Sequence, residues 1–198
     1  EYNTFGNIQK EIAWGEVQSN GNGIFSDVEN DQKSVTYTYA KNTDNQESSF
    51  ISEIITKDAA GKTFEHSRSY YDHQILSKLT KGNPTREEAW LNTKNTFVGI
   101  DKTYNNLGLL ATTSDANGNT TTIEYEAKNL YPQKITNEKG HTEEFTYDLH
   151  AGQITQKIDA NGIKTMATLD GLGRLKSVSK NGNLIEEYSY DDDTLPNF

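Results

Sequence analysis

The sequence predicts an all-β protein built as a row of antiparallel hairpins, and three observations support this fold class. Strand-favouring residues are abundant, with 23 Thr, 14 Ile, 11 Tyr and 7 Phe among 198 residues. Turn sequences of the Asp-x-x-Gly and Asn-Gly type recur at regular intervals. Between these turns, apolar and polar side chains alternate with a period of two, which is typical of strands with one covered face.

The first element of the repeat is a residue that closes a strand. Such residues recur every 21 or 22 positions at Tyr104, Tyr125, Tyr147, Leu169 and Tyr190. Each is followed by a polar residue, as at Asp148 and Asp170. A glycine then follows four or five places after the strand-closing residue at Gly108, Gly152 and Gly173, and the unit that starts at Tyr125 lacks it. This fixed period indicates a repeat architecture.

A second turn recurs every 22 residues. It reads Asp115 to Gly118, Asn137 to Gly140 and Asp159 to Gly162. The pairs Asn117-Gly118, Asn161-Gly162 and Asn181-Gly182 favour two-residue hairpin turns, because both residue types tolerate positive φ. Each repeat is therefore expected to form one hairpin.

The strands that follow this second turn have two different faces. Thr121, Ile123 and Tyr125 share one face, whereas Thr122 and Glu124 lie on the other. The next units repeat the pattern with Phe145, Tyr147, Ala167 and Leu169 on the first face. One face is therefore semi-apolar and the other polar.

These residues resemble the tyrosine-aspartate (YD) repeats of the RHS family, which includes bacterial polymorphic toxins, the B and C components of insecticidal toxin complexes, wall-associated proteins and the teneurins. The resemblance rests on Tyr147-Asp148, Asp159 to Gly162 and Asp170 to Leu175. It implies that successive hairpins join edge to edge into a sheet that spirals into a hollow shell. The residues to which it gives a structural role in the repeat are Tyr104, Gly108, Asp115, Gly118, Tyr125, Gly140, Tyr147, Asp148, Asp159, Gly162, Asp170, Gly173, Arg174 and Tyr190.

The resemblance divides the chain into a divergent region, 1–103, and regular repeats, 104–198. In the first region, Tyr2 to Asn7 has the repeat's opening, Asp58 to Gly61 its second turn, and Tyr70 to Gly82 looks like a divergent unit. Polar insertions at Ser19 to Lys33 and Asn42 to Ser49 predict longer loops.

One segment of the divergent region is ambiguous. Residues Thr85 to Asn95 fit a short helix, with Thr85 and Glu88 as a capping box, equally well as a strand and turn.

Composition excludes several classes of function. The formal charge of −10 argues against nucleic acid, which requires a basic surface. The absence of Cys excludes disulfides and thiolate metal sites, and no apolar run approaches the length of a membrane span. The run from Asp115 to Asn119 is similar to an oxygen-rich calcium loop but lacks the bidentate carboxylate further on, so a turn is preferred.

Catalytic motifs are also missing from the sequence. Neighbouring acids such as Glu143 and Glu144 point to opposite faces of a strand and cannot act as a pair. His66, His73, His141 and His150 lack the spacing of zinc hydrolases. Arg174 fits a packing role, in which its stem covers apolar neighbours and its guanidinium binds acids or carbonyls. We therefore expect no enzyme activity, metal or cofactor.

The expected function is that of a non-enzymatic structural segment of a larger RHS/YD-repeat protein. It would form part of a β-shell that encloses or displays another polypeptide, as in toxin or effector delivery. The expected partners are neighbouring repeats of a longer parent chain and an enclosed toxin polypeptide. The alternative is a carbohydrate-binding or adhesive surface module that uses Trp14 or Trp90 and binds surface glycans. The resemblance implies a bacterial protein that is secreted or lies at the cell surface, and the start at Glu1 suggests a fragment.

Overall fold

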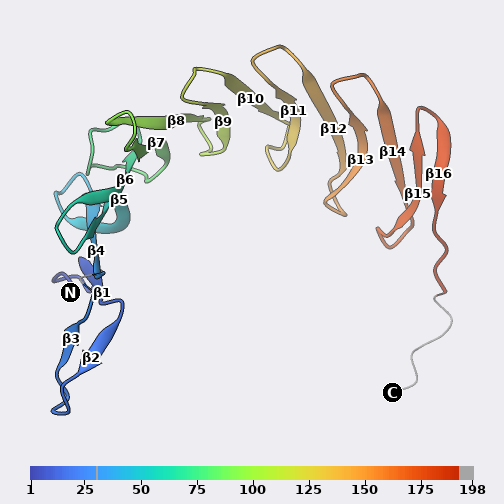
Figure 1. Cartoon of the computed structure of the whole chain (residues 1–198). Helices are drawn as coiled ribbons and strands as arrows, with labels where there is room; N and C mark the ends of the chain where they lie inside the picture. The colour runs from blue at the N-terminus through green and yellow to red at the C-terminus, as the bar shows by residue number, and fades with distance from the viewer. Residues whose placement is uncertain (30, 192–198) are drawn as a thin grey trace. The chain divides into compact units, whose positions relative to one another are not determined.

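The computed structural model describes residues 1–29 and 31–191, and its contacts divide the chain into two units, Glu1–Gly118 and Asn119–Phe198. All regular secondary structure in the described residues is β-strand (Figure 1). Accordingly, none of these residues forms a helix that could cross a membrane. The all-β class predicted from composition and turn spacing is confirmed.

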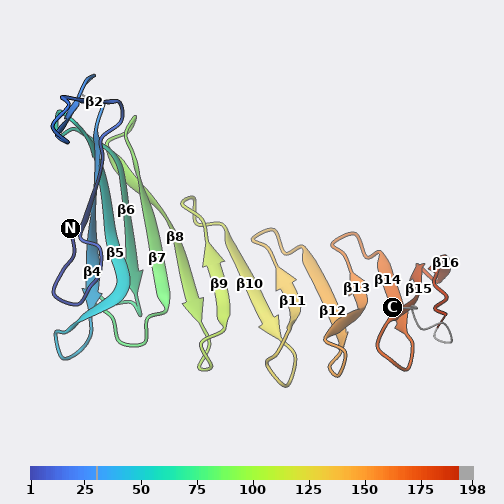
Figure 2. The ribbon, with the colours of Figure 1, turned by 90° about the horizontal axis from the view of Figure 1, so that it is seen from below.

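The first unit contains an antiparallel sheet and a separate two-stranded ribbon. The sheet has the order β1 (Lys10–Ala13), β4 (Lys33–Lys41), β5 (Glu47–Asp58), β6 (Thr63–Tyr71), β7 (Pro84–Leu91), β8 (Thr96–Tyr104) and β9 (Leu110–Ser114). The ribbon pairs β2 (Val17–Ser19) with β3 (Phe25–Asp27). Figure 2 shows the long strands β4 to β8 side by side.

The second unit consists of shorter strands in strict sequence order. They are β10 (Thr120–Tyr125), β11 (Pro132–Thr136), β12 (Thr142–Asp148), β13 (Gln153–Ile158), β14 (Lys164–Leu169), β15 (Leu175–Lys180) and β16 (Asn183–Glu187). Each strand pairs with the next in antiparallel register, so the unit is a row of hairpins (Figure 1). This is the edge-to-edge hairpin arrangement that the repeat predicts.

Side-chain alternation follows the predicted period of two. Tyr125, Phe145 and Tyr147 are half-buried, whereas Glu124 and Glu144 are exposed. Cross-strand pairing places Ile123 opposite Ile135 on the half-buried face. We refer to this face of the second unit as the tyrosine face.

The ambiguous segment Thr85 to Asn95 is strand and turn, not helix. Its first part is β7, which pairs with β6 on one side and β8 on the other, so that Arg86 lies between Tyr70 and Asp101. Two sets of ladder hydrogen bonds outweigh the local capping signal, because a strand between two neighbours satisfies its backbone on both edges.

The predicted loops of the first unit are shorter than expected. Ser19 to Lys33 contains β3, and the ribbon accounts for much of that insertion. In the second insertion, Asn42–Gln46 forms a turn that is closed by a hydrogen bond from the Asn42 N–H to the Gln46 carbonyl (2.9 Å). Strand β5 begins directly afterwards, at Glu47.

The expected two-residue Asn-Gly turn is found only at Asn181-Gly182. There both residues have positive φ, +48° and +84°, between the paired residues Lys180 and Asn183. At Asn117-Gly118 and Asn161-Gly162 only the glycine has positive φ. Those glycines end a four-residue Asp-x-Asn-Gly turn, since the Gly162 N–H donates to the Asp159 carbonyl (2.9 Å). The preceding Asp therefore changes the turn type, which the Asn-Gly pair alone did not predict.

The buried core of the described residues lies in the first unit. Its apolar members are Tyr39, Ala40, Tyr71 and Leu79, and its polar members are Ser52, Thr56 and Thr85. The described part of the second unit adds no residue to this group. The second unit is a single layer, and the side chains on its tyrosine face are only half-buried.

Candidate functional site

The repeat tyrosines close the open ends of their own hairpins. The Tyr104 hydroxyl donates to the Pro84 carbonyl (2.9 Å), and the Tyr147 hydroxyl donates to the Pro132 carbonyl (2.8 Å). The Tyr190 hydroxyl likewise donates to the Leu175 carbonyl (2.9 Å). In each case the accepting residue begins the first strand of the hairpin that the tyrosine completes. We call this contact the tyrosine staple.

The divergent region 1–103 makes the same kind of tyrosine contact, but the accepting residue lies before β1 or inside β5 and not at the first position of a strand. The Tyr39 hydroxyl donates to the Ile8 carbonyl (2.8 Å), and the Tyr71 hydroxyl donates to the Ile51 carbonyl (2.6 Å). Tyr71 belongs to the divergent unit expected from the sequence, but Tyr39 did not stand out as a repeat residue. The 32 and 33 residues that separate Tyr39, Tyr71 and Tyr104 hide the period, because the connections are longer here.

One repeat, at Leu169, lacks the tyrosine at the staple position. Leu169 has no hydroxyl and contributes only its half-buried side chain. Tyr125 is half-buried at the end of β10, where a register shift places it opposite Pro132. Burial at the strand-closing position therefore varies, from half-buried side chains at Tyr125, Tyr147 and Leu169 to Tyr190, which is 42% exposed.

The polar residue after the strand-closing position caps the following turn at Asn105, Glu126, Asp148 and Asp170. One Asp148 oxygen accepts the N–H groups of His150 (2.9 Å) and Ala151 (3.0 Å). An Asp170 oxygen accepts those of Leu172 and Arg174, both at 2.9 Å. The second turns use the same contact, with Asp159 accepting from Asn161 (2.9 Å) and Ile163 (3.0 Å), and Asp115 accepting from Asn117 (2.8 Å).

These hydrogen bonds favour the ionised form of the capping acids. The backbone N–H groups of Ala151 and His150 lower the pKa of Asp148. The pKa of Asp170 is lowered chiefly by the Arg174 N–H, against an opposing effect of burial, and further by the Arg174 side chain. Both carboxylates therefore stabilise turns through hydrogen bonds to backbone N–H groups.

The repeat glycines adopt the left-handed conformation. Positive φ values between +66° and +87° occur at Gly108, Gly118, Gly140, Gly152, Gly162 and Gly173. Where the repeat lacks a glycine, Asn129 takes the conformation instead, with φ +57°. The Glu126 carboxylate caps that turn by accepting the N–H groups of Lys128 and Leu130 (2.6 and 2.7 Å).

Arg174 links a turn to a staple. Its Nε donates to Asp170 Oδ2 (2.7 Å), and its guanidinium carbon lies 4.2 Å from the centre of the Tyr190 ring. The side chain thus combines an ion pair with a cation–π contact. Arg174 therefore packs between the turn that begins at Asp170 and the ring of Tyr190.

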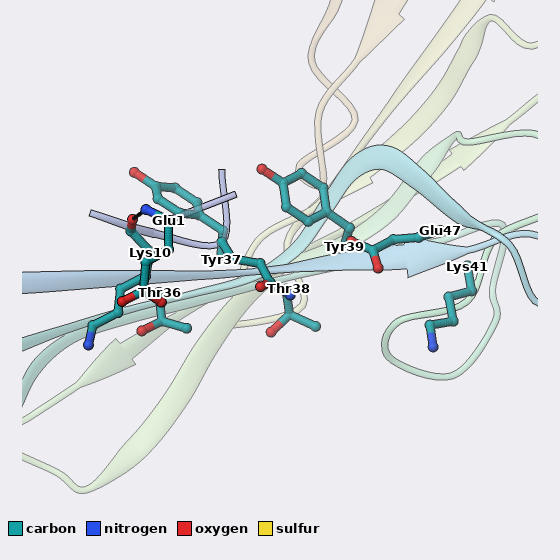
Figure 3. Close-up of a pocket in the computed structure, with 9 residues that line it drawn as sticks. Glu1, Lys10, Thr36, Tyr37, Thr38, Tyr39, Lys41 and Glu47 are labelled. Atoms are coloured by element: carbon teal, nitrogen blue, oxygen red, sulfur yellow. Dashed lines mark hydrogen bonds between the residues drawn. The ribbon is translucent and has the colours of Figure 1, made fainter. Parts of the chain in front are cut away.

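The chain also carries an open groove of about 420 Å³ over β4 (Figure 3). Tyr37 and Tyr39 point to one side of the strand, and Thr36 and Thr38 to the other. The Tyr37 hydroxyl donates to Glu11 Oε2 (2.8 Å), and this hydrogen bond raises the pKa of Tyr37. The groove therefore contains a tyrosine that is already hydrogen-bonded to a neighbouring strand.

Acidic and histidine side chains do not gather into a metal centre. Within residues 1–29 and 31–191, no three or more His, Asp or Glu side chains are placed to hold a metal ion. The Asp115 to Gly118 run is a turn, closed by the Gly118 N–H on the Asp115 carbonyl (3.0 Å).

Comparisons with known proteins find a likeness in fold and none in sequence. No family model and no curated protein matches the chain by sequence. Its fold matches the crystal structure of TcdB2-TccC3-Cdc42 with a TM-score of 0.66 and 12% identity, over 94% of this chain and 13% of that chain. A weaker likeness, with a TM-score of 0.47 and 15% identity, covers 80% of this chain and 10% of a chain in the Photorhabdus luminescens Tc holotoxin pore. The chain therefore has the RHS/YD-type β fold that its repeats predict.

Proposed function

We propose that this chain is a non-enzymatic structural segment of a larger protein that encloses or displays another polypeptide during toxin delivery. The observation that carries the proposal is that the repeat side chains form hydrogen bonds with the backbone. Tyrosine hydroxyls and capping carboxylates both bind the backbone of their own hairpin, as at Tyr147 and Asp148. The residues that define the repeat thus serve to build a sheet.

The match to TcdB2-TccC3-Cdc42 supports the same proposal at the level of fold. The chain spans only 13% of the length of that matched chain, so the matched region is one stretch of a much larger one. We propose that this chain holds an equivalent place, with neighbouring repeats at its sheet edges and a carried polypeptide as its partner.

The proposal can be tested on the tyrosine face. A permanently unfolded probe, fluorescently labelled carboxymethylated α-lactalbumin, is titrated against the chain and followed by anisotropy. The variant Ile123→Asp with Ile135→Asp places two charges on the tyrosine face and should weaken binding at least tenfold. The matched variant Thr122→Asp with Thr136→Asp changes the paired positions on the opposite face and should leave binding unchanged. An equal loss of binding in both variants, with unchanged circular dichroism, would refute the proposal that a carried polypeptide binds the tyrosine face.

The alternative function is glycan binding, and one observation favours it. Trp90 lines a hollow of about 330 Å³ together with Phe64, Glu65 and His66. Aromatic rings beside polar side chains are typical of small-ligand sites. Binding on a glycan array that is abolished by Trp90→Ala would support this alternative, whereas the structural proposal expects no such binding.

A further inference from the structure

The connection between β6 and β7, residues 72–83, folds back onto β4, and we call it the strap. The Lys41 N–H donates to the Ser77 carbonyl, and the Leu79 N–H donates to the Lys41 carbonyl, both at 3.0 Å. These bonds make a short parallel bridge between Lys41 and Lys78. The strap therefore behaves as a fragment of strand that reaches back over the sheet.

The strap completes the core of the first unit. Leu79 forms the buried apolar cluster with Ala40 and Tyr71, with exposures of 7%, 0% and 8%. The Ser77 hydroxyl lies 3.0 Å from the hydroxyl of Ser52, which is fully buried. Removal of the strap would therefore expose both an apolar cluster and a buried hydroxyl.

One carboxylate holds the end of the strap. Asp72 Oδ2 accepts the N–H groups of Thr80 (2.8 Å), Lys81 (2.7 Å) and Gly82 (2.8 Å). Asp72 Oδ1 accepts the N–H of Asn83 (3.0 Å). Four successive backbone donors thus converge on two oxygens. This is the arrangement of a backbone nest, which binds anions.

The strap is also strained. Asp72, His73 and Ser77 have φ values of +52°, +57° and +65°. Side chains with a Cβ disfavour this left-handed region, so the conformation needs an external restraint. The Asp72 carboxylate supplies this restraint together with two backbone donors, because the Asp72 N–H donates to the Asn83 carbonyl (2.8 Å) and the His73 N–H donates to the Thr85 hydroxyl (2.9 Å).

We propose that residues Thr80 to Asn83 form a carboxylate-binding nest, that Asp72 occupies it within the chain, and that this occupancy folds the strap onto β4. A free carboxylate anion takes the same site when the Asp72 carboxylate is removed. The ligand class follows from the donors, because four N–H groups shared by two oxygens match one carboxylate.

The electrostatics of Asp72 support an anion in this position. Burial by itself raises the pKa of Asp72, but the N–H groups of Gly82, Thr80, Asn83 and Lys81 outweigh it and lower the pKa to about 2. The nest therefore stabilises the charged carboxylate over the neutral acid.

The test removes the carboxylate and supplies it in solution. In Asp72→Ala, amide hydrogen exchange of residues 77–83 should accelerate at least tenfold. Sodium formate should restore protection and shift the amide resonances of Thr80 to Asn83, and sodium chloride at equal ionic strength should do neither. Unchanged exchange in Asp72→Ala, or equal effects of the two salts, would overturn the proposal.

Two further variants separate the nest from general destabilisation. Asp58 also caps a turn of the first unit, where one oxygen accepts the Lys62 N–H (2.8 Å), but it binds no strap. Asp58→Ala should therefore leave the exchange of residues 77–83 unchanged and show no response to formate. Should Asp72→Ala fail to fold, Asp72→Asn keeps one acceptor oxygen, and partial protection that formate does not improve is expected. Full protection in Asp72→Asn would contradict a site built for a carboxylate.

Discussion

The hydroxyl of Tyr147 makes a single hydrogen bond, and its effect on stability can be separated from that of the ring. Tyr147→Phe removes the bond to the Pro132 carbonyl and should lower the free energy of unfolding by about 1 kcal/mol. Tyr147→Ala also removes a ring that stacks on Tyr131 at 4.8 Å and should cost about 2 kcal/mol, below the range for fully buried rings. Urea unfolding measures both values. Tyr2→Phe, at a side chain that is 70% exposed, is the control and should be neutral.

Gly99 illustrates a glycine that is required by space and not by φ. A Cβ at this position would lie 2.9 Å from the Glu87 carbonyl oxygen and 3.0 Å from Glu88 Cγ. Gly99→Ala must therefore displace the backbone of β7 and should cost roughly 1–3 kcal/mol. Gly171→Ala is the matched control, because a Cβ there meets nothing within 4 Å. Equal melting temperatures of the two variants would contradict this account.

The charge of Asp72 predicts a pH dependence. Its pKa is lowered from 3.8 to about 2 in the folded chain, so the charged form stabilises the fold. This contribution is fully present above the unfolded-state pKa and is lost as the pH falls through the folded-state pKa. His73, Lys78 and Lys81 are the other ionisable residues of the strap, and Lys41 on β4 pairs with Lys78 through the backbone.

The measurement compares wild type with Asp72→Asn by denaturant unfolding between pH 6 and pH 2, a range set about the two pKa values. The difference in unfolding free energy should stay constant down to about pH 4 and then shrink towards pH 2. Capping acids such as Asp148 and Asp170 are present in both proteins and cancel in the difference. A difference that grows on acidification would contradict the assigned sign.

At the scale of the element, two turns with the same Asn-Gly pair should respond differently to mutation. Asn181 has positive φ, and its side-chain oxygen accepts the Lys164 N–H (3.0 Å), so Asn181→Ala should cost roughly 1–2 kcal/mol. Asn161 does not have positive φ, and its N–H is bound by Asp159 irrespective of its side chain. Asn161→Ala should therefore be close to neutral. Thermal denaturation of both variants decides the point.

The hairpins of the second unit could be predicted from sequence because their signals are local. A capping acid, a left-handed glycine and a strand-closing residue lie within one repeat of each other, as in Asp159, Gly162 and Leu169. The strap could not be predicted, because its contacts join Leu79 to Ala40 and Ser77 to Ser52 across unrelated spacings. Residues 85–95 remained ambiguous for a similar reason, since the pairing of β7 with two neighbours is not local.

At the scale of the whole molecule, the last described strand is an edge that should recruit other strands. β16 is exposed along its length, with Leu184 and Ile185 at 62% and 54%. Acidic side chains at Glu186, Glu187 and Asp191 surround this edge, while Asp192 and Asp193 lie outside the described residues.

Neutralising this charge should increase association. The triple variant Glu186→Gln, Glu187→Gln and Asp191→Asn is expected to form larger species in light scattering, because repulsion between copies is reduced. The control Glu124→Gln with Glu144→Gln changes exposed acids that lie away from β16 and should leave the size distribution unchanged. A triple variant that remains monomeric would show that charge does not protect the edge.

The tyrosine staple has a consequence for how such repeats diverge over evolutionary time. Each staple ends on a main-chain carbonyl, an atom that every amino acid supplies, so the accepting position is free to change. Pro84, Pro132, Leu175, Ile51 and Ile8 already fill it in this chain. A tyrosine on one strand can therefore keep this contact whichever side chain stands at the accepting position.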